Sequence, residues 1–168
     1  MRALLSHSLR LLAAALALAA ASCGSSSGSS STDTFVGTWS FQSGAIMAGC
    51  PVMVDNVDLT GDVVTMTKID SSHVLMTITG TGVMCDVRFS VSDTIATADA
   101  NQTCAISASG QSAVVAVSSW TLTAATSSIS MTMSGSTTVT AAGFSLTCMP
   151  TATGLMVRTS ADAAPSAG

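Results

Sequence analysis

The chain has 168 residues, of which only 8% are charged, with five Lys or Arg against nine Asp and no Glu. Its formal net charge of −4 argues against nucleic-acid binding, because phosphate groups need many Lys and Arg side chains to neutralise them. So few charges leave solvation mainly to Ser and Thr hydroxyls, and the abundance of Thr and Val favours β-strands.

The first 22 residues have the three parts of an export signal. Arg2 and Arg10 provide positive charge, residues 11–21 form an unbroken apolar run, and small residues end the segment. An apolar run of 11 residues is too short to cross a membrane as a helix, which needs about 20. We therefore expect residues 1–22 to be removed on export.

The segment Ala20-Ala21-Ser22-Cys23 resembles the lipobox of bacterial lipoproteins, in which the cysteine is acylated and becomes the new N-terminus. The resemblance implies that Cys23 is the lipidation site, with palmitate among its acyl chains, and that it anchors the protein in the cell envelope. Gly24 rather than Asp follows the cysteine, which favours the outer membrane, on its periplasmic or surface face. The alternative is ordinary cleavage near Ala21, with Cys23 left as a thiol.

The composition changes again after Cys23. Residues 24–31 are all Gly or Ser, which is typical of a flexible tether. We assign residues 23–34 to the lipidated cysteine and its tether, 35–159 to one folded domain, and 160–168 to a disordered tail. Without the signal, three basic residues remain against nine aspartates, a formal net charge of −6.

Four further cysteines remain in the mature chain: Cys50, Cys85, Cys104 and Cys148. An even number in an exported protein predicts two disulfides. We favour Cys85–Cys104, because the segment between them has the pattern of two strands around a turn, and Cys50–Cys148, which closes the domain almost end to end. The two other pairings remain open. A zinc site is disfavoured because no close Cys-x-x-Cys pair is present.

Apolar and polar residues alternate with a period of two from Phe35 onward, and no segment has a helical pattern. Gly44–Pro51 is predicted to be a loop or a short irregular strand. The alternation predicts strands over the following ranges: Val36–Phe41, Val63–Ile69, His73–Thr79, Val83–Ser92, Thr94–Ala98, Thr103–Ser107, Val114–Thr123, Ile129–Thr140 with a bulge at Gly135, Phe144–Cys148 and Leu155–Thr159.

This pattern predicts an all-β domain of eight to ten short antiparallel strands. A small meander barrel is the simplest arrangement, because closure leaves no strand edges exposed. A two-sheet β-sandwich is the alternative.

The sequence Gly37-Thr38-Trp39 in the first predicted strand resembles the Gly-x-Trp motif of lipocalins and other calycin barrels. In that family the Trp packs across the closed end of the barrel, beneath an Arg from near the last strand. Arg158 lies in the last predicted strand and is suited to a cation–π contact with Trp39. The resemblance implies a lipocalin-like barrel with Trp39 and Arg158 as a closure pair, and a central pocket for a small apolar ligand.

The sequence offers few catalytic groups. His73, the single histidine after the signal, lies beside Asp70, Ser71 and Ser72 at a predicted turn. A Ser-His-Asp relay needs three side chains that converge on one substrate, and sequential neighbours at a turn do not provide this. We therefore expect no enzyme, no catalytic residue and no cofactor.

Two segments contain residue types that bind metals. Residues 55–58 with Asp62 have the oxygen ligands of a calcium loop, and Met131 and Met133 have the thioethers of a copper site. A loop between strands explains the first equally well, and the core-facing side of a strand explains the second. We therefore predict no metal site.

Three functional hypotheses remain, of which an enzyme is the least favoured and requires a pocket that holds converging aspartates or His73. The first is a membrane-anchored lipoprotein whose barrel binds a small apolar ligand, which requires a cavity of several hundred Å³ lined by Met, Val, Ile and Phe. The alternative is a structural or surface-interaction lipoprotein with a filled core. The sequence does not indicate which protein partners it has.

Overall fold

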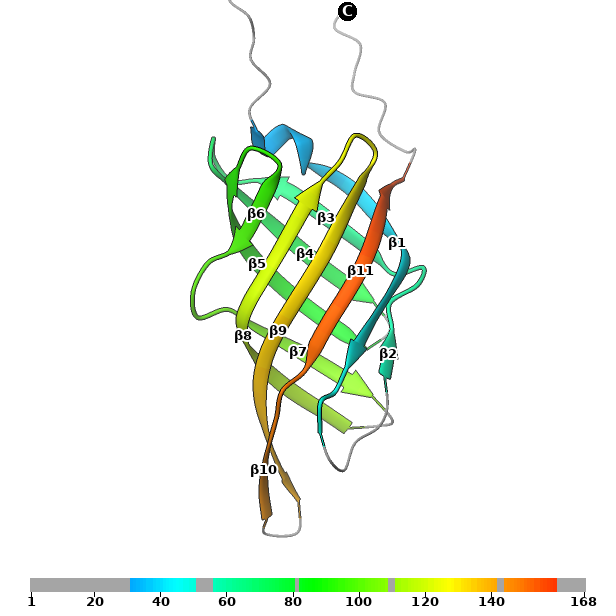
Figure 1. Cartoon of the computed structure of the whole chain (residues 1–168), viewed down its shortest axis with the longest axis vertical. Coiled ribbons are helices and arrows are strands. Elements are labelled where there is room, and N and C mark those ends of the chain that lie inside the picture. Colours follow the sequence, from blue (N-terminus) through cyan, green and yellow to red (C-terminus); the bar gives the residue numbers. More distant parts are fainter. Residues whose placement is uncertain (1–30, 51–55, 81, 109–110, 142–143, 160–168) are drawn as a thin grey trace, which may run out of the picture.

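The computed structural model describes residues 31–50, 56–80, 82–108, 111–141 and 144–159 (Figure 1). The export signal, Cys23, most of the tether and the C-terminal tail lie outside these ranges. No helix in the described part of the chain is long and apolar enough to cross a membrane.

The described chain is almost entirely β-structure. Its elements in chain order are a 3-10 turn η1 (Ser31–Thr34) and the strands β1 (Gly37–Met47), β2 (Asn56–Asp58), β3 (Val63–Lys68), β4 (His73–Gly80), β5 (Val83–Ser92), β6 (Ile95–Ala98), β7 (Thr103–Ala108), β8 (Gln111–Ala124), β9 (Ser128–Ala141), β10 (Phe144–Cys148) and β11 (Thr151–Arg158).

Eight of these strands close into an antiparallel barrel in the order β1-β3-β4-β5-β6-β8-β9-β11. Each strand pairs with its neighbour along this order, and β11 returns to pair with β1. The predicted meander barrel is therefore confirmed, and the sandwich is excluded. Closure removes the exposed edges that such a long run of strands would otherwise leave.

The three remaining strands extend this barrel. β2 adds to one end of β1, and β10 pairs with the far end of β9, beyond the barrel wall (Figure 1). β7 lies beside β6 in the gap between β5 and β8. β6 and β7 together therefore take the place of one interrupted strand of the wall.

The alternation of side chains divides the barrel into an apolar interior and a polar exterior. In β5 the residues Val83, Cys85, Val87 and Phe89 are buried, whereas the residues between them are exposed. The same rule places every methionine of β3, β4 and β9 inside. The largest fully buried side chains are Trp39, Phe35, Phe41, Phe89, Leu59, Met66, Met76, Leu122, Ile129 and Met156.

Several strands are longer than the sequence pattern predicted, and two of the extensions are at the closing seam. β1 continues to Met47 through the segment expected to be a loop or a short irregular strand, and β11 begins at Thr151 rather than at Leu155. These two extensions pair with each other, and Gly44 lies opposite Gly154 at their centre. A Cβ on Gly154 would lie 2.7 Å from the Phe41 ring, so the close approach of that ring explains this glycine.

The predicted bulge at Gly135 is wrong in its position. The register shift between β8 and β9 lies between Val117 and Ser119, so β8 carries the extra residue. Gly135 lies at this register shift, as the partner of Val117, and a Cβ on it would lie 2.6 Å from a Val115 methyl and 2.8 Å from the Ala116 carbonyl oxygen. Close approach of the two strands, rather than a bulge in β9, requires glycine here.

Candidate functional site

The end of the barrel where β1 begins is closed by a plug. The backbone N–H groups of Phe35 and Val36 donate to the Thr32 carbonyl, at 3.0 and 3.2 Å, and Thr32 and Phe35 are fully buried. Four residues that the sequence assigned to the tether, Ser31–Thr34, thus form part of the folded domain. Together with the buried Phe35, these residues close this end of the barrel and keep water from the core.

Trp39 and Arg158 fix this plug to the wall. The two residues are paired across β1 and β11, and the guanidinium carbon lies 4.4 Å from the centre of the Trp39 ring. Arg158 also donates to the carbonyls of Val36 and Thr34, at 2.7 and 3.1 Å, while the Trp39 indole N–H donates to the Phe35 carbonyl at 2.8 Å. The contact expected from the sequence is present.

Gly37 makes room for this arrangement. Its φ is +135°, a conformation that residues with a side chain rarely adopt. A Cβ at this position would lie 2.6 Å from Nη1 of Arg158. The glycine of the Gly-x-Trp motif is therefore required both by the backbone and by the guanidinium above it.

One disulfide joins two paired antiparallel strands, and the other joins residues just beyond the paired ends of β1 and β11. Met84 pairs with Ala105, and the next residues along the two strands are Cys85 and Cys104, with Cα atoms 4.8 Å apart. Cys50 and Cys148 similarly extend the β1–β11 pairing, with Cα atoms 4.7 Å apart. Both predicted pairings are confirmed.

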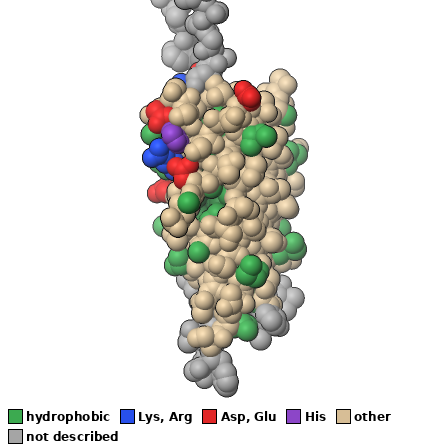
Figure 2. All heavy atoms as spheres, turned by 60° about the vertical axis from the view of Figure 1, so that its left-hand side comes forward, with side chains coloured by type: hydrophobic (Ala, Val, Ile, Leu, Met, Phe, Trp, Pro, Cys, Tyr) green, Lys and Arg blue, Asp and Glu red, His purple; other side chains and the backbone are tan. Residues whose placement is uncertain are grey.

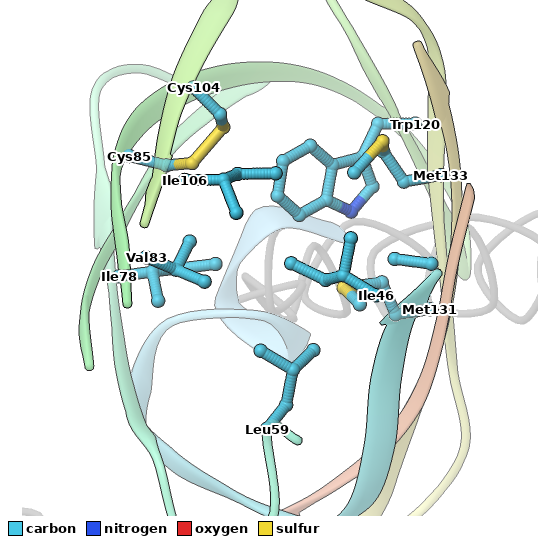
Figure 3. Close-up of a pocket in the computed structure, with 11 residues that line it drawn as sticks. Ile46, Leu59, Ile78, Val83, Cys85, Cys104, Ile106, Trp120, Met131 and Met133 are labelled. Carbon is cyan, nitrogen blue, oxygen red and sulfur yellow. A yellow bond between two sulfur atoms is a disulfide. The ribbon is translucent and has the colours of Figure 1, made fainter. Parts of the chain in front are cut away.

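The interior at the opposite end holds a small cavity of about 10 Å³ (Figure 3). This is about the volume that one water molecule needs, so the described side chains leave little empty space in this part of the interior. The cavity lies where β1 ends and β11 begins, far from the plug. The surface that it exposes is entirely apolar, and its lining comprises Ile46, Leu59, Ile78, Val83, Cys85, Cys104, Ile106, Trp120, Met131, Met133 and Ala152.

Trp120 is the unusual member of this lining. Its side chain is only 2% exposed and its ring meets Phe89 edge-on, with the ring centres 5.9 Å apart. Its indole N–H has no hydrogen-bond partner among the described residues. Alternation puts Trp120 on the same face of β8 as Leu122, but it carries no information on whether a buried donor finds an acceptor.

The turn between β3 and β4 gathers Asp70, Ser72 and His73, but not as a relay. Nδ1 of His73 lies 2.8 and 2.9 Å from the two Asp70 carboxylate oxygens and 3.1 Å from the Ser72 hydroxyl. A relay needs the serine on the other ring nitrogen, Nε2. The backbone N–H of Ser72 and then His73 hold the pKa of Asp70 well below its ordinary value, which stabilises the turn.

The described residues of metal-binding type pack in the core or make hydrogen bonds within a turn. Met131 and Met133 are 2% and 5% exposed and belong to the core. Asp58 accepts a bond from the Thr60 backbone N–H at 2.9 Å, and Asp55 lies outside the described residues. Within the described ranges, no group of three or more His, Cys, Asp or Glu is placed to hold a metal ion.

The outer wall has two chemically different sides. Charged pairs gather on the strands β3 to β6, where Lys68 and Arg88 meet Asp33 and Asp99 at 2.8 and 3.0 Å. No charged residue occurs between Asp99 and Arg158 in the sequence, so β8 and β9 are neutral. In the face that Figure 2 shows, most charged side chains gather at the upper left, one acidic side chain lies apart from them near the top, and the rest of the face is uncharged.

A regular row of hydroxyls crosses the neutral side. Thr97 of β6, Thr121 of β8, Thr132 of β9 and Thr153 of β11 are paired in sequence across four neighbouring strands. On this side of the wall, threonine hydroxyl groups rather than charged groups provide hydrogen bonds to water.

Comparison of the chain with protein-family models, with curated proteins and with solved structures finds no match in any of the three.

Proposed function

We propose that the mature chain is a lipid-anchored envelope protein whose barrel is a non-catalytic structural and surface-interaction module. The observation that carries this proposal is the filled interior, because about 10 Å³ is far below the roughly 300 Å³ of a usual ligand pocket. A barrel that holds no bulky ligand acts through its outside.

The path of the chain suits an anchor at the plug end. The described chain begins at η1, and its last residue, Thr159, donates to the Thr38 carbonyl at the same end (Figure 1). A tether from Cys23 to Ser31 would therefore hold the plug toward the membrane and direct the opposite end and its β9–β10 extension away from it. Two disulfides agree with an oxidising, exported location.

The two sides of the wall provide the interaction surface. The neutral, hydroxyl-rich side over β8 and β9 and the charged side over β3 to β6 differ enough to recognise different partners. The exposed ion pairs, Lys68–Asp33 and Arg88–Asp99, add little stability, so their removal would leave the fold intact.

The plug supports a relation to lipocalin-like barrels. Gly37, Trp39 and Arg158 combine a strained glycine, a buried indole and a guanidinium over its face, as the motif implies. An eight-stranded antiparallel meander is compatible with that class. The relation supports a shared way of closing the barrel and does not by itself supply a ligand.

Binding of a small apolar molecule is the second candidate function. It is favoured by the unpartnered Trp120 N–H beside an apolar cavity. Any such molecule must displace side chains that fill the barrel at present.

Mass spectrometry of the purified full-length product tests both parts of the main proposal. The N-terminal peptide should begin at an acylated Cys23, and the Cys23→Ala variant should lack the acyl mass and leave the membrane fraction. Native and denaturing spectra of the intact protein should give the same mass. An organic molecule of more than about ten heavy atoms that is retained only in the native spectrum would overturn the filled-core proposal.

A further inference from the structure

The two most exposed large apolar side chains of the described chain lie in one row across the outer wall. Met84 of β5 and Val114 of β8 are 70% and 64% exposed. Both are paired with Ala105 of β7, which lies between them and is exposed as well. Single apolar residues are common on protein surfaces, but these three are direct neighbours across three strands. They form a continuous apolar row with a thioether at one end.

Exposure divides the methionines of the described chain into two groups. Met84 belongs with Met149 and Met47, which are 59% and 51% exposed. The methionines of the second group are at most 5% exposed and fill the interior: Met66, Met76, Met131, Met133 and Met156. A small oxidant in solution therefore reaches the first group directly, and it reaches the second group only when the barrel opens locally.

We propose that Met84 is a modification site at which a peroxide oxidises the thioether to a sulfoxide. A lone pair of the sulfur attacks one oxygen of hydrogen peroxide, so that an S–O bond forms as the O–O bond breaks. A proton then passes from the new S–OH group to the departing hydroxide, which leaves as water. The sulfur loses two electrons and the peroxide gains them. A thioether carries no charge and no proton, so access of the oxidant rather than a neighbouring base sets the rate.

The sulfoxide makes this row polar without loosening the barrel. Its oxygen is a strong hydrogen-bond acceptor, whereas a thioether sulfur is a weak one. At the exposed Met84 the new oxygen is solvated by water, and no buried group loses a partner. The same change at Met131 would bury a polar oxygen among apolar side chains, which is costly. Oxidation at Met84 therefore alters the outer wall alone, and it does not depend on the surface role proposed above.

Two variants of the full mature chain isolate Met84. Both carry Cys23→Ala, so that no acyl chain dominates the surface. Both also carry Met47→Leu, Met149→Leu and Met53→Leu, the last at a position outside the described residues. One variant retains Met84, and the other carries Met84→Leu, which keeps the row apolar but cannot form a sulfoxide. Methionine methyl signals in the carbon–proton NMR spectrum follow each remaining methionine in hydrogen peroxide, and comparison of the two variants assigns Met84.

The Met84 signal should be lost to the sulfoxide at least about tenfold faster than any core methionine signal, because the core methionines need local opening. Core signals that stay in place show that the barrel is still folded. On a hydrophobic-interaction column the oxidised Met84 variant should elute earlier, and methionine sulfoxide reductases A and B should restore its original elution. The Met84→Leu variant should elute unchanged after the same peroxide treatment.

Three results would overturn the proposal. Met84 could be oxidised no faster than Met131, so that exposure does not control the reaction. Peroxide could shift the elution of both variants equally, so that Met84 does not determine the polarity of the row. The core methyl signals could lose their folded positions while Met84 alone is oxidised, so that the modification is not confined to the outer wall.

Discussion

The substitution Gly37→Ala tests whether the plug depends on the contact between Gly37 and Arg158. The new methyl group would lie 2.6 Å from Nη1 of Arg158, well inside van der Waals contact, on a backbone with φ +135°. Either the backbone or the guanidinium must move. Movement of Arg158 breaks its bonds to the Val36 and Thr34 carbonyls and its contact with the Trp39 ring.

The expected cost has two parts. Backbone strain in this region is worth about 1–3 kcal/mol. The contacts of the partly exposed Arg158 add about 1–2 kcal/mol, because exposed hydrogen bonds and cation–π contacts lie at the low end of their ranges. Gly61 provides a matched control, since its φ is +88° and nothing lies within 4 Å of the place that a methyl group would take. Gly61→Ala should therefore show the strain alone.

Urea unfolding with both disulfides oxidised measures these costs as free energies of unfolding. Gly37→Ala should be about 1–2 kcal/mol less stable than Gly61→Ala, through the Arg158 contacts counted above. When Gly37→Ala is combined with Arg158→Met, the total should fall short of the sum of the two by about the same amount, because both changes remove the same contacts. Equal costs at the two glycines together with strict additivity would refute the plug argument.

Four further results follow from the structure. A disulfide that closes a longer loop removes more conformational entropy from the unfolded chain, and the two bridges here have sequence separations of 98 and 19. In urea unfolding, replacing Cys50 and Cys148 by Ala should therefore cost about 4.7 kcal/mol, and replacing Cys85 and Cys104 by Ala about 3 kcal/mol. The reverse order would contradict this argument. Met131→Ala should cost about 2–5 kcal/mol in thermal unfolding, whereas Met84→Ala, at an exposed site, should cost less than about 0.5 kcal/mol. The pKa of Asp70 is lower in the folded state than in the unfolded state, so the ionised side chain stabilises the protein above the unfolded pKa, and this effect is lost as the pH falls toward the folded pKa. The difference in melting temperature between the parent protein and Asp70→Asn should therefore be largest above about pH 5 and shrink below about pH 4. A difference that stays constant with pH would argue against the turn contacts. Cys23→Ala should move the protein from the membrane fraction to the soluble fraction on cell fractionation, and retention in the membrane would exclude a lipid anchor at that residue.

Much of the fold could be predicted because the information is local. Alternation with a period of two identifies the strands and the side of each that is buried, as in Val83–Ser92. The sequence favoured the observed pairing of the cysteines, because the segment between Cys85 and Cys104 has the pattern of strands around a turn, but only the structure excluded the two other pairings. The contact of Trp39 with Arg158 was expected from the resemblance of Gly37-Thr38-Trp39 to the lipocalin motif, and the structure contains it.

The tertiary structure decided what depends on distances between strands. Glycine has a low strand propensity and is typical of loops. Gly44 and Gly154 nevertheless lie within strands, because the pairing of β1 with β11, which closes the barrel, outweighs this propensity. The extra residue of the β8–β9 pair lies in β8 rather than at Gly135, because the register of the two strands decides where it falls. The volume inside the barrel is likewise set by how side chains from eight strands interlock. Alternation placed Trp120 and Leu122 on one face of β8, and only packing decided that this face is buried and that the Trp120 N–H meets no acceptor among the described residues.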